Sequence, residues 1–465
     1  MIQIAKLIKK NIPFYYGWVI VAGSGSTMFV RNAAATLTIS VFVYPMSEDL
    51  GWSRTLIVGA SSLAGIISIF ISPLSGYIIQ KFGSKITLLF SVALLGLSTI
   101  LISRTFTPIT FYILFGIGRI IFSSPIQIGA STVVTKWFIN NRGKAIGILG
   151  LMHSLGMGLF PLFAQIVMNL DGNKIDSWRL SWVCIGISVW LLSLPLVFFS
   201  MINNPKNIIN ENNKYLKINK SSNISIRSDK SITLKNAFKS KSFWMLSFVG
   251  FLTYFIHTGV NIHQAAYLID KGLSPIIAAF ALTIMAIGTG FGSIVTGWAT
   301  DRFNSKKVYL FATFLLGLSS LLFLLITTLF SAYLIAFIFG ITLGGLLVIP
   351  PVVLADIFGK ENIGAIRGYT EPFVSAGQAA GGLSAGVTTA DFMYGLKYEF
   401  NSFYITYAMI KTIFFAFIIS SVSAYFGYHT KGGAIAVGKA GTSAVVTSSI
   451  LILLFNYILT NLILS

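Results

Sequence analysis

Long apolar runs, separated by short polar segments, fill almost the whole chain. A membrane-spanning helix needs roughly 20 apolar residues, and thirteen stretches satisfy this requirement. The pattern therefore predicts an all-α polytopic membrane protein. We place the thirteen predicted spans at 15–45, 54–79, 86–103, 108–134, 144–169, 179–201, 243–268, 276–299, 307–329, 331–357, 365–388, 401–427 and 443–464.

Composition and charge support this prediction and exclude other classes. Of the 465 residues, 55% are hydrophobic and only 10% are charged, which a soluble domain could not bury. The net charge of +20 does not indicate nucleic-acid binding, because the basic residues are unevenly distributed. With the N-terminus in the cytoplasm, 24 Lys and Arg lie on the cytoplasmic side and 6 on the opposite side. We expect a multi-pass protein of the cytoplasmic (inner) membrane, with a cytoplasmic N-terminus.

The segment 202–241 is polar and rich in Asn, Lys and Ser, with no apolar periodicity. It predicts a flexible cytoplasmic linker between two helical blocks. We therefore expect four parts. They are an N-terminal six-helix bundle at 1–201, the linker at 202–241, helices 7–11 of a second bundle at 242–390, and a tail with two helices at 391–465.

Two internal matches indicate that the blocks are copies of one unit. "GYIIQKFGSK" (76–85) matches "GWATDRFNSK" (297–306) at an offset of 221 residues. "WFINNRGKAIG" (137–147) aligns with "IFGKENIGAIRG" (357–368) at an offset of 220. Parallel repeats of this kind occur in transporters that bind substrate between two halves. We predict that both members of the first pair lie at the same membrane face.

The first pair resembles the signature loop of the major facilitator superfamily. The resemblance implies a fold of two six-helix bundles and a loop that locks one conformation by charge pairing. The acidic position of this loop is Asp301 in the second half and Gln80 in the first, which predicts a weaker lock in the first half. The residues expected to control conformation are Gly76, Lys81, Lys85, Arg142, Gly297, Asp301, Arg302 and Lys306.

Further stretches resemble the oxalate/formate and monocarboxylate group of that superfamily. They are "YYGW" (15–18), "LGWSR" (50–54), "WFINNRGKAIGI" (137–148) and "HQAAYLIDKGLSP" (263–275). The resemblance implies a monomeric secondary transporter of a small organic anion. An arginine that these carriers often place in the eighth span is Ser293 here, which departs from the group's pattern.

The tail follows a different pattern. Residues 417–464 resemble the C-terminal end of the permease subunit of Mla-type ABC phospholipid transporters. The resemblance explains the thirteenth span as surplus and suggests a fusion, with 401–427 in the place of a twelfth facilitator helix. Two alternatives therefore remain: part or a remnant of an ABC-type phospholipid permease, or an inactive fusion.

Ionisable residues within spans are costly, by about 3 kcal/mol on insertion scales, and are therefore candidates for function. Arg31 and Arg119 lie near the middle of the first and fourth spans, and we expect them to face one central cavity. Helical spacing places polar residues on one face of the fourth, seventh and eleventh spans. The predicted substrate-binding residues are Arg31, Arg119, Gln127, His257, Asn261, His263 and Glu371, whereas His153 is interpreted as a packing residue.

Two buried arginines against one buried carboxylate predict a positive cavity, which favours an anion because guanidinium binds carboxylate bidentately. We expect a mono- or dicarboxylate to move by alternating access, either with protons or by exchange. The loops contain no nucleophile–base set or metal-ligand cluster, and Cys184 is the single cysteine. The sequence therefore predicts neither an enzyme nor a cofactor.

Overall fold

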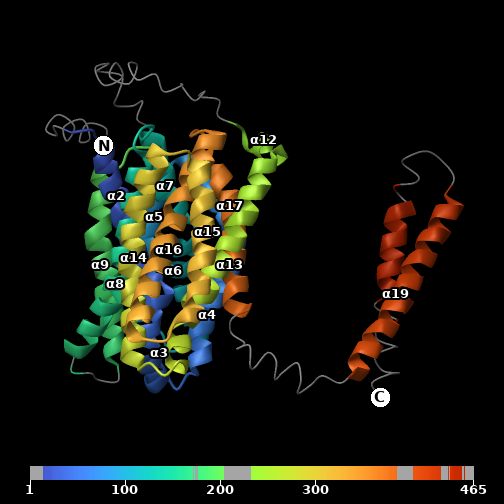
Figure 1. Cartoon of the computed structure of the whole chain (residues 1–465), viewed down its shortest axis with the longest axis horizontal. Helices are drawn as coiled ribbons and strands as arrows, with labels where there is room; N and C mark the ends of the chain where they lie inside the picture. The colour runs from blue at the N-terminus through green and yellow to red at the C-terminus, as the bar shows by residue number, and fades with distance from the viewer. Residues whose placement is uncertain are drawn as a thin grey trace. The chain divides into compact units, whose positions relative to one another are not determined.

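The computed structural model describes residues 14–170, 172, 176–203, 232–384, 402–430, 438, 440–452 and 455. The chain forms two compact units, Met1–Gly386 and Val387–Ser465. All regular secondary structure within the described residues is helical (Figure 1).

The first unit contains two groups of long helices. The first group is α2 (Gly17–Val30), η1 (Arg31–Ala34), α3 (Thr36–Leu50), α4 (Arg54–Phe82), α5 (Ser84–Ile102), α6 (Pro108–Ser123), α7 (Pro125–Trp137), α8 (Arg142–Leu170) and α9 (Ser177–Ser200). The second is α12 (Leu234–Lys239), α13 (Lys241–Asp270), α14 (Pro275–Arg302), α15 (Ser305–Leu322), η2 (Phe323–Leu325), α16 (Leu329–Phe358) and α17 (Ile363–Ser384).

The second unit contains α19 (Ser402–His429) and an apolar helix at Ala440–Ile452. Predicted spans twelve and thirteen fall in this unit. The prediction that 401–427 takes the place of a twelfth facilitator helix stays a prediction, and much of 443–464 lies outside the described residues.

Ten helical segments within the described residues are long and apolar enough to cross a membrane. They correspond to the first ten predicted spans. The eleventh is helix α17, which has 22 residues and carries the polar side chains Arg367, Glu371 and Gln378. These polar residues lower its hydropathy, so that α17 spans the bundle without an apolar signature.

Two predicted spans contain breaks that the hydrophobic pattern does not reveal. The first span changes to a 3₁₀ turn at η1 and then to extended backbone at Ala35. The fourth is interrupted at Ser124, where φ is −127° and ψ is −77°. Pro125 follows and cannot donate a backbone hydrogen bond. Both breaks leave backbone carbonyls available for other donors within the apolar interior.

The predicted linker is shorter than expected. Residues Leu234–Lys239 form α12, in which Ala237 is fully buried. Ile232 donates a backbone hydrogen bond to the carbonyl of Phe358, at 2.9 Å. The apolar side chains of this short helix pack on the end of α16 and the start of α13. We call this end of the first unit the linker end; it is uppermost in Figure 1.

The two groups of helices pack through glycines in α4, α8, α14 and α17. A Cβ at Gly76 would lie 2.7 Å from Cα of Gly368 and 2.8 Å from the carbonyl oxygen of Gly364. A Cβ at Gly297 would lie 2.5 Å from the carbonyl oxygen of Gly143. The same Cβ would lie 3.2 Å from Cα of Gly147.

An offset of 221 residues carries one set of these glycines onto the other, which confirms the internal repeat. In the structure, the two segments of the second sequence match therefore correspond at an offset of 221 residues, and not at the expected 220. The glycines of the helix crossing determine which residues correspond, and the identities around Phe138 and Phe358 do not. Both members of the first pair lie at the linker end, as predicted.

We expect Gly76→Ala to lower the thermal midpoint of the protein in detergent. Its methyl group would meet backbone atoms that cannot move aside, and such overpacking costs about 1–3 kcal/mol. Gly65→Ala on the same helix is the control, because a Cβ there has nothing within 4 Å. Equal midpoints for the two variants would contradict the close helix crossing.

Candidate functional site

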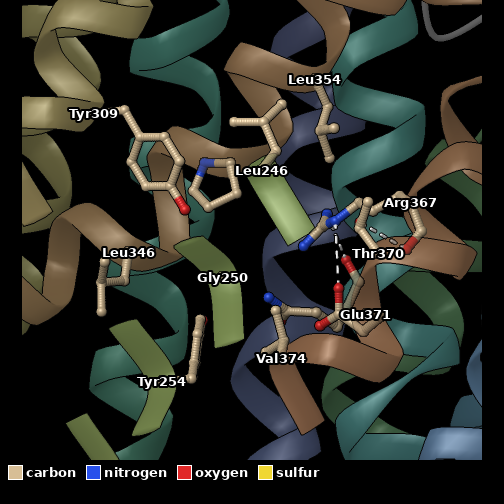
Figure 2. A pocket seen from close by; sticks show the side chains of 12 residues that line it. Leu246, Gly250, Tyr254, Tyr309, Leu346, Leu354, Arg367, Thr370, Glu371 and Val374 are labelled. Carbon is tan, nitrogen blue, oxygen red and sulfur yellow. Dashed lines mark hydrogen bonds and ion pairs between the residues drawn. The ribbon is translucent and has the colours of Figure 1, made fainter. Parts of the chain in front are cut away.

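A cavity lies inside the first unit and is lined by helices of both groups (Figure 2). Its empty volume is about 500 Å³, which includes open solvent. One wall is largely apolar, with two tyrosines, and the other carries an arginine and a glutamate. The lining residues are Gln127, Leu246, Gly250, Tyr254, Tyr309, Leu346, Pro350, Leu354, Arg367, Thr370, Glu371 and Val374.

Arg367 and Glu371 form the charged wall of this cavity. They lie one turn apart on α17, with 3.8 Å between Nε and Oε2, and both are buried. Arg367 also donates to the backbone carbonyl of Gln127, at 3.2 Å, and so connects the two groups of helices. Figure 2 shows this pair together, with the hydroxyl of Tyr309 directed toward the cavity from the other side. Arg367 lies one turn inside α17, which begins at Ile363, and it was not among the predicted binding residues.

Arg31 lies behind the cavity wall and is only 3% exposed. Its Nη1 donates to the carbonyl of Phe122 at 3.1 Å and to the side-chain oxygen of Gln127. Its Nε donates to Nδ1 of His153 at 3.3 Å. Gln127 lines the cavity, so it connects the guanidinium of Arg31 to the cavity surface.

Arg119 is close to Arg31 but makes different contacts. The guanidinium carbons of Arg31 and Arg119 each lie 4.4 Å from the ring centre of Phe122. Nε of Arg119 is buried and has no hydrogen-bond partner among the described residues. The structure thus brings the two predicted arginines together on one aromatic ring, although neither lines the cavity itself.

The remaining predicted binding residues lie on α13. The ring of His257 is 5.8 Å from Tyr254 and 6.5 Å from Phe339, and both of its nitrogens lack a partner among the described residues. Asn261 and His263 are half-buried farther along the helix. Of the predicted α13 residues, His257 therefore lies nearest the cavity, through its contact with Tyr254.

Asp301 closes the linker end by capping a helix of the other group. Its two carboxylate oxygens accept hydrogen bonds from the backbone nitrogens of Gly143, at 2.7 Å, and Lys144, at 2.8 Å. These are donors of the first turn of α8, where a negative charge is stabilised by the helix dipole. A carboxylate in one half therefore satisfies the helix terminus of the other.

A second contact between the halves lies beside the first. Nη1 of Arg142 is 3.0 Å from Oδ1 of Asp356, and the hydroxyl of Ser305 donates to Oδ2 at 2.6 Å. The equivalent of Asp301 in the first half, Gln80, donates to the carbonyl of Glu361 at 2.9 Å. The first half thus also contacts the second half here. Its contact is a hydrogen bond from a neutral amide, whereas Asp301 caps α8 with a charged carboxylate.

The other predicted gating residues make contacts within their own half. Lys81 lies over the rings of Tyr77 and Phe82, and Arg302 lies over Trp298. Nζ of Lys85 donates to the carbonyl of Phe198 at 2.7 Å, and the backbone nitrogen of Lys306 donates to Asn304.

Sequence reasoning missed Arg367, His153 and Asp356 as members of these sites. The spacing of Arg367 and Glu371 by four residues was a usable signal, because it places opposite charges on one helix face. His153 and Asp356 gave no local signal, since their arginine partners, Arg31 and Arg142, lie 122 and 214 residues away in the sequence. The described residues contain no group of three His, Cys, Asp or Glu that could hold a metal ion.

Comparisons with known proteins give two different matches along the chain. The family model of the Major Facilitator Superfamily matches residues 25–382, and the model of Permease MlaE matches residues 373–462. Monocarboxylate transporter 12 of Xenopus laevis is 26% identical over 404 residues, which are 81% of this chain and 85% of that protein. These matches agree with the two resemblances noted in the sequence.

The fold and the tail each have a further relative. The solved structure of the proton:xylose symporter XylE, bound to 6-bromo-6-deoxy-D-glucose, matches with a TM-score of 0.59 at 16% identity. The match covers 82% of this chain and 90% of that one. A probable ABC transporter permease protein of Rickettsia prowazekii is 57% identical over 54 residues, which are 12% of this chain and 21% of that protein.

We expect Asp301→Ala to open the linker end more often. Loss of two hydrogen bonds to an ionised carboxylate, worth about 1.5–3 kcal/mol each, should raise the rate of opening at least about tenfold. The rate is measured by maleimide labelling of Ser293→Cys, a fully buried position on α14, in a Cys184→Ser background. Asp301→Asn should label at a rate between those of the wild type and Asp301→Ala, because an amide offers one acceptor oxygen.

Asp270→Ala, an exposed carboxylate at the end of α13, is the matched control. If Asp301→Ala labels no faster than Asp270→Ala, the cap does not hold this end closed.

Proposed function

This chain belongs to the Major Facilitator Superfamily, and on that premise we propose that it is a secondary transporter that carries a small organic anion across the cytoplasmic membrane by alternating access. The observation that carries the proposal is the excess of buried positive charge at the centre of the first unit. Arg31, Arg119 and Arg367 gather around Gln127 and Phe122, and Glu371, which pairs with Arg367, is the one carboxylate paired with an arginine of this group among the described residues.

The three arginines are not equally available to a substrate. Arg367 is already paired with Glu371, and Arg31 donates to three acceptors. Among the described residues Arg119 has only an aromatic contact; its Nε is buried without an acceptor, and an unsatisfied buried donor is costly. An incoming carboxylate would supply that acceptor, since guanidinium forms paired hydrogen bonds with it. We therefore assign the substrate's charge first to Arg119, with Arg31 as its neighbour on Phe122.

The cavity walls suggest the rest of the substrate. The side formed by α13 and α16 is apolar except for Tyr254, which suits a short hydrocarbon portion. The opposite side offers Gln127, Arg367 and Thr370 to polar groups. A carboxylate with a small apolar body fits this division better than a sugar, and the name of the monocarboxylate transporter relative supports the same class.

The contacts between the halves support alternating access. The hydrogen bonds of Asp301, Arg142 and Gln80 hold the linker end together, and that end is the predicted cytoplasmic side. Opening to the cytoplasm would require these contacts to break and the neighbouring glycine crossings to separate. Glu371, the carboxylate that lines the cavity, would be the group that couples transport to protons or to a counter-anion.

A second candidate is supported by the tail. The match to Permease MlaE suggests that residues 373–462 derive from an ABC-type phospholipid permease. It spans a small share of such a permease, whereas the facilitator match extends over most of the chain. We therefore assign transport to the first unit and treat the permease remnant and the inactive fusion as outcomes to be tested.

Uptake by proteoliposomes tests the proposal. Labelled formate, acetate, lactate, oxalate and succinate are offered with and without a pH gradient. Arg119→Ala should abolish uptake of the anion that the wild type takes up. Arg119→Lys should recover only part of the rate, because an ammonium cannot form the bidentate contact.

Arg104→Ala is the matched control, since Arg104 is an exposed arginine between α5 and α6. Unchanged uptake by Arg119→Ala would refute the assigned role. Failure of the wild type to take up any of the five anions would refute the anion proposal.

Removal of residues 430–465 tests the part played by the tail. If transport belongs to the first unit, the truncated protein should keep its uptake rate within about twofold and its elution profile in detergent. A truncated protein that folds but does not transport would show that the tail is an integrated part of the transporter.

A further inference from the structure

His153 lies in the middle of α8 and is held between two residues of the first-span break. Its Nδ1 is 3.3 Å from both Nε and Nη2 of Arg31 and 3.1 Å from Nδ2 of Asn32. All three side chains are buried: His153 is 8% exposed, Arg31 3% and Asn32 not at all. One histidine nitrogen therefore faces three candidate donors in a space closed to solvent.

The orientation of the Asn32 amide can be determined from its neighbours. Its Nδ2 lies 3.1 Å from the carbonyl of Met28, 3.2 Å from that of Phe29 and 3.0 Å from that of His153. Carbonyl oxygens only accept hydrogen bonds, so the amide atom among them must be the nitrogen. Asn32 thus presents a donor, and not an acceptor, to the imidazole.

The tautomer of His153 follows from these partners. The guanidinium of Arg31 has donors only, and Asn32 presents its NH₂ group. Nδ1 must therefore carry a lone pair, and the ring proton must be on Nε2. A proton on Nδ1 would place an N–H group against three donors and a second positive charge beside Arg31.

We propose that His153 is an uncharged positioning residue that fixes the guanidinium of Arg31 for the anion site through the lone pair on Nδ1. The imidazole holds the Nε edge of Arg31, while the Phe122 carbonyl and Gln127 hold Nη1. The guanidinium is fixed on two sides, so its plane against the ring of Phe122 is determined. This inference rests on the proposed function only in its assumption that Arg31 takes part in binding the anion.

Gly156 makes this arrangement possible. A Cβ at Gly156 would lie 2.3 Å from the carbonyl oxygen of Phe29 and 2.6 Å from Nδ2 of Asn32. The absence of a side chain one turn beyond His153 lets α8 approach the break closely enough for the imidazole to reach Arg31. Gly156 and His153 thus both contact the segment that contains Arg31 and Asn32.

The charged and titratable groups around His153 come from several helices. Arg31 on η1 and His257 on α13 act on it directly. Arg119 on α6, Tyr254 on α13, and Arg367 and Glu371 on α17 act on Arg31. Three of these six groups are arginines, which are cationic, and His257 would become cationic on gaining a proton, so the surroundings oppose a further positive charge on His153. The role is therefore to accept hydrogen bonds and not to carry protons.

The first experiment reads the tautomer and does not depend on transport. Nitrogen NMR of ¹⁵N-histidine-labelled full-length protein is recorded between pH 5 and 8, and His153→Gln identifies the signals of His153 by their loss. His429→Gln, an exposed histidine at the end of α19, is the control for assignment. We expect an unprotonated Nδ1 and a protonated Nε2 at every pH. A protonated Nδ1, or a change of state across this range, would overturn the proposal.

The second experiment separates positioning from bulk. His153→Leu removes the acceptor and should raise KM for the transported anion at least about tenfold with kcat within about twofold, because a hydrogen bond to a charged group is worth about that factor. His153→Gln keeps an acceptor oxygen and should recover most of the KM. Equal KM for leucine and wild type, or a folded Gln variant as impaired as Leu, would refute the role.

The two experiments also distinguish this proposal from the function on which it rests. If the wild type transports no anion, the proposed function fails while the NMR result still decides the state of His153. If the Leu variant does not fold, the Gln variant and the NMR measurement remain decisive.

Discussion

The burial of the Arg31 guanidinium is the constraint on which the centre of this protein depends. An arginine at mid-membrane costs roughly 3 kcal/mol on insertion scales unless its donors are satisfied. The chain meets this cost with acceptors from three elements: the Phe122 carbonyl at the end of α6, Gln127 on α7 and His153 on α8. The irregular backbone at η1 and Ser124 also belongs to this arrangement, because Arg31 lies in the first break and the Phe122 carbonyl lies beside the second. Non-helical backbone is tolerated at this depth only where protein or water surrounds it.

The duplicated scaffold and the central charges follow different rules. The glycine crossings correspond in the two halves, because close helix packing in a membrane requires small residues at both. The central charges have no such counterparts: at the offset of 221, Arg367 corresponds to Ile146 and Glu371 to Gly150. The halves therefore share the contacts by which they pack and differ in the groups that would meet a substrate. The contacts at the linker end are shared only in part, because the two halves have corresponding residues there that differ in charge: a carboxylate at Asp301 and an amide at Gln80.

Most of the helices and the internal repeat could be predicted, because both depend on local hydrophobicity and on short matches. The polar centre was predictable only in part. Arg31, Arg119 and Gln127 were recognised from their depth in an apolar run, which is a local property. Arg367 was not recognised because it lies near the polar end of the predicted span 365–388, where sequence alone cannot say whether a side chain is buried. His153 looked like a packing residue beside glycines, since its acceptor role exists only once α8 meets η1.

The unequal satisfaction of the arginines bears on how binding could drive a conformational change. A ligand shifts an equilibrium only by its difference in affinity for the two states. Arg31 and Arg367 keep protein acceptors without a substrate, so they contribute little to such a difference. Under the proposed function, the hydrogen bonding of Arg119 would change most between an empty and an occupied site, because its Nε has no partner among the described residues. Its neighbour Phe122 belongs to the break that also supports Arg31, so a movement of Arg119 toward an anion would be transmitted to η1 and α8. Under the proposed function, the link between substrate and helix movement therefore runs from Arg119 through Phe122 to the segment that His153 holds in place.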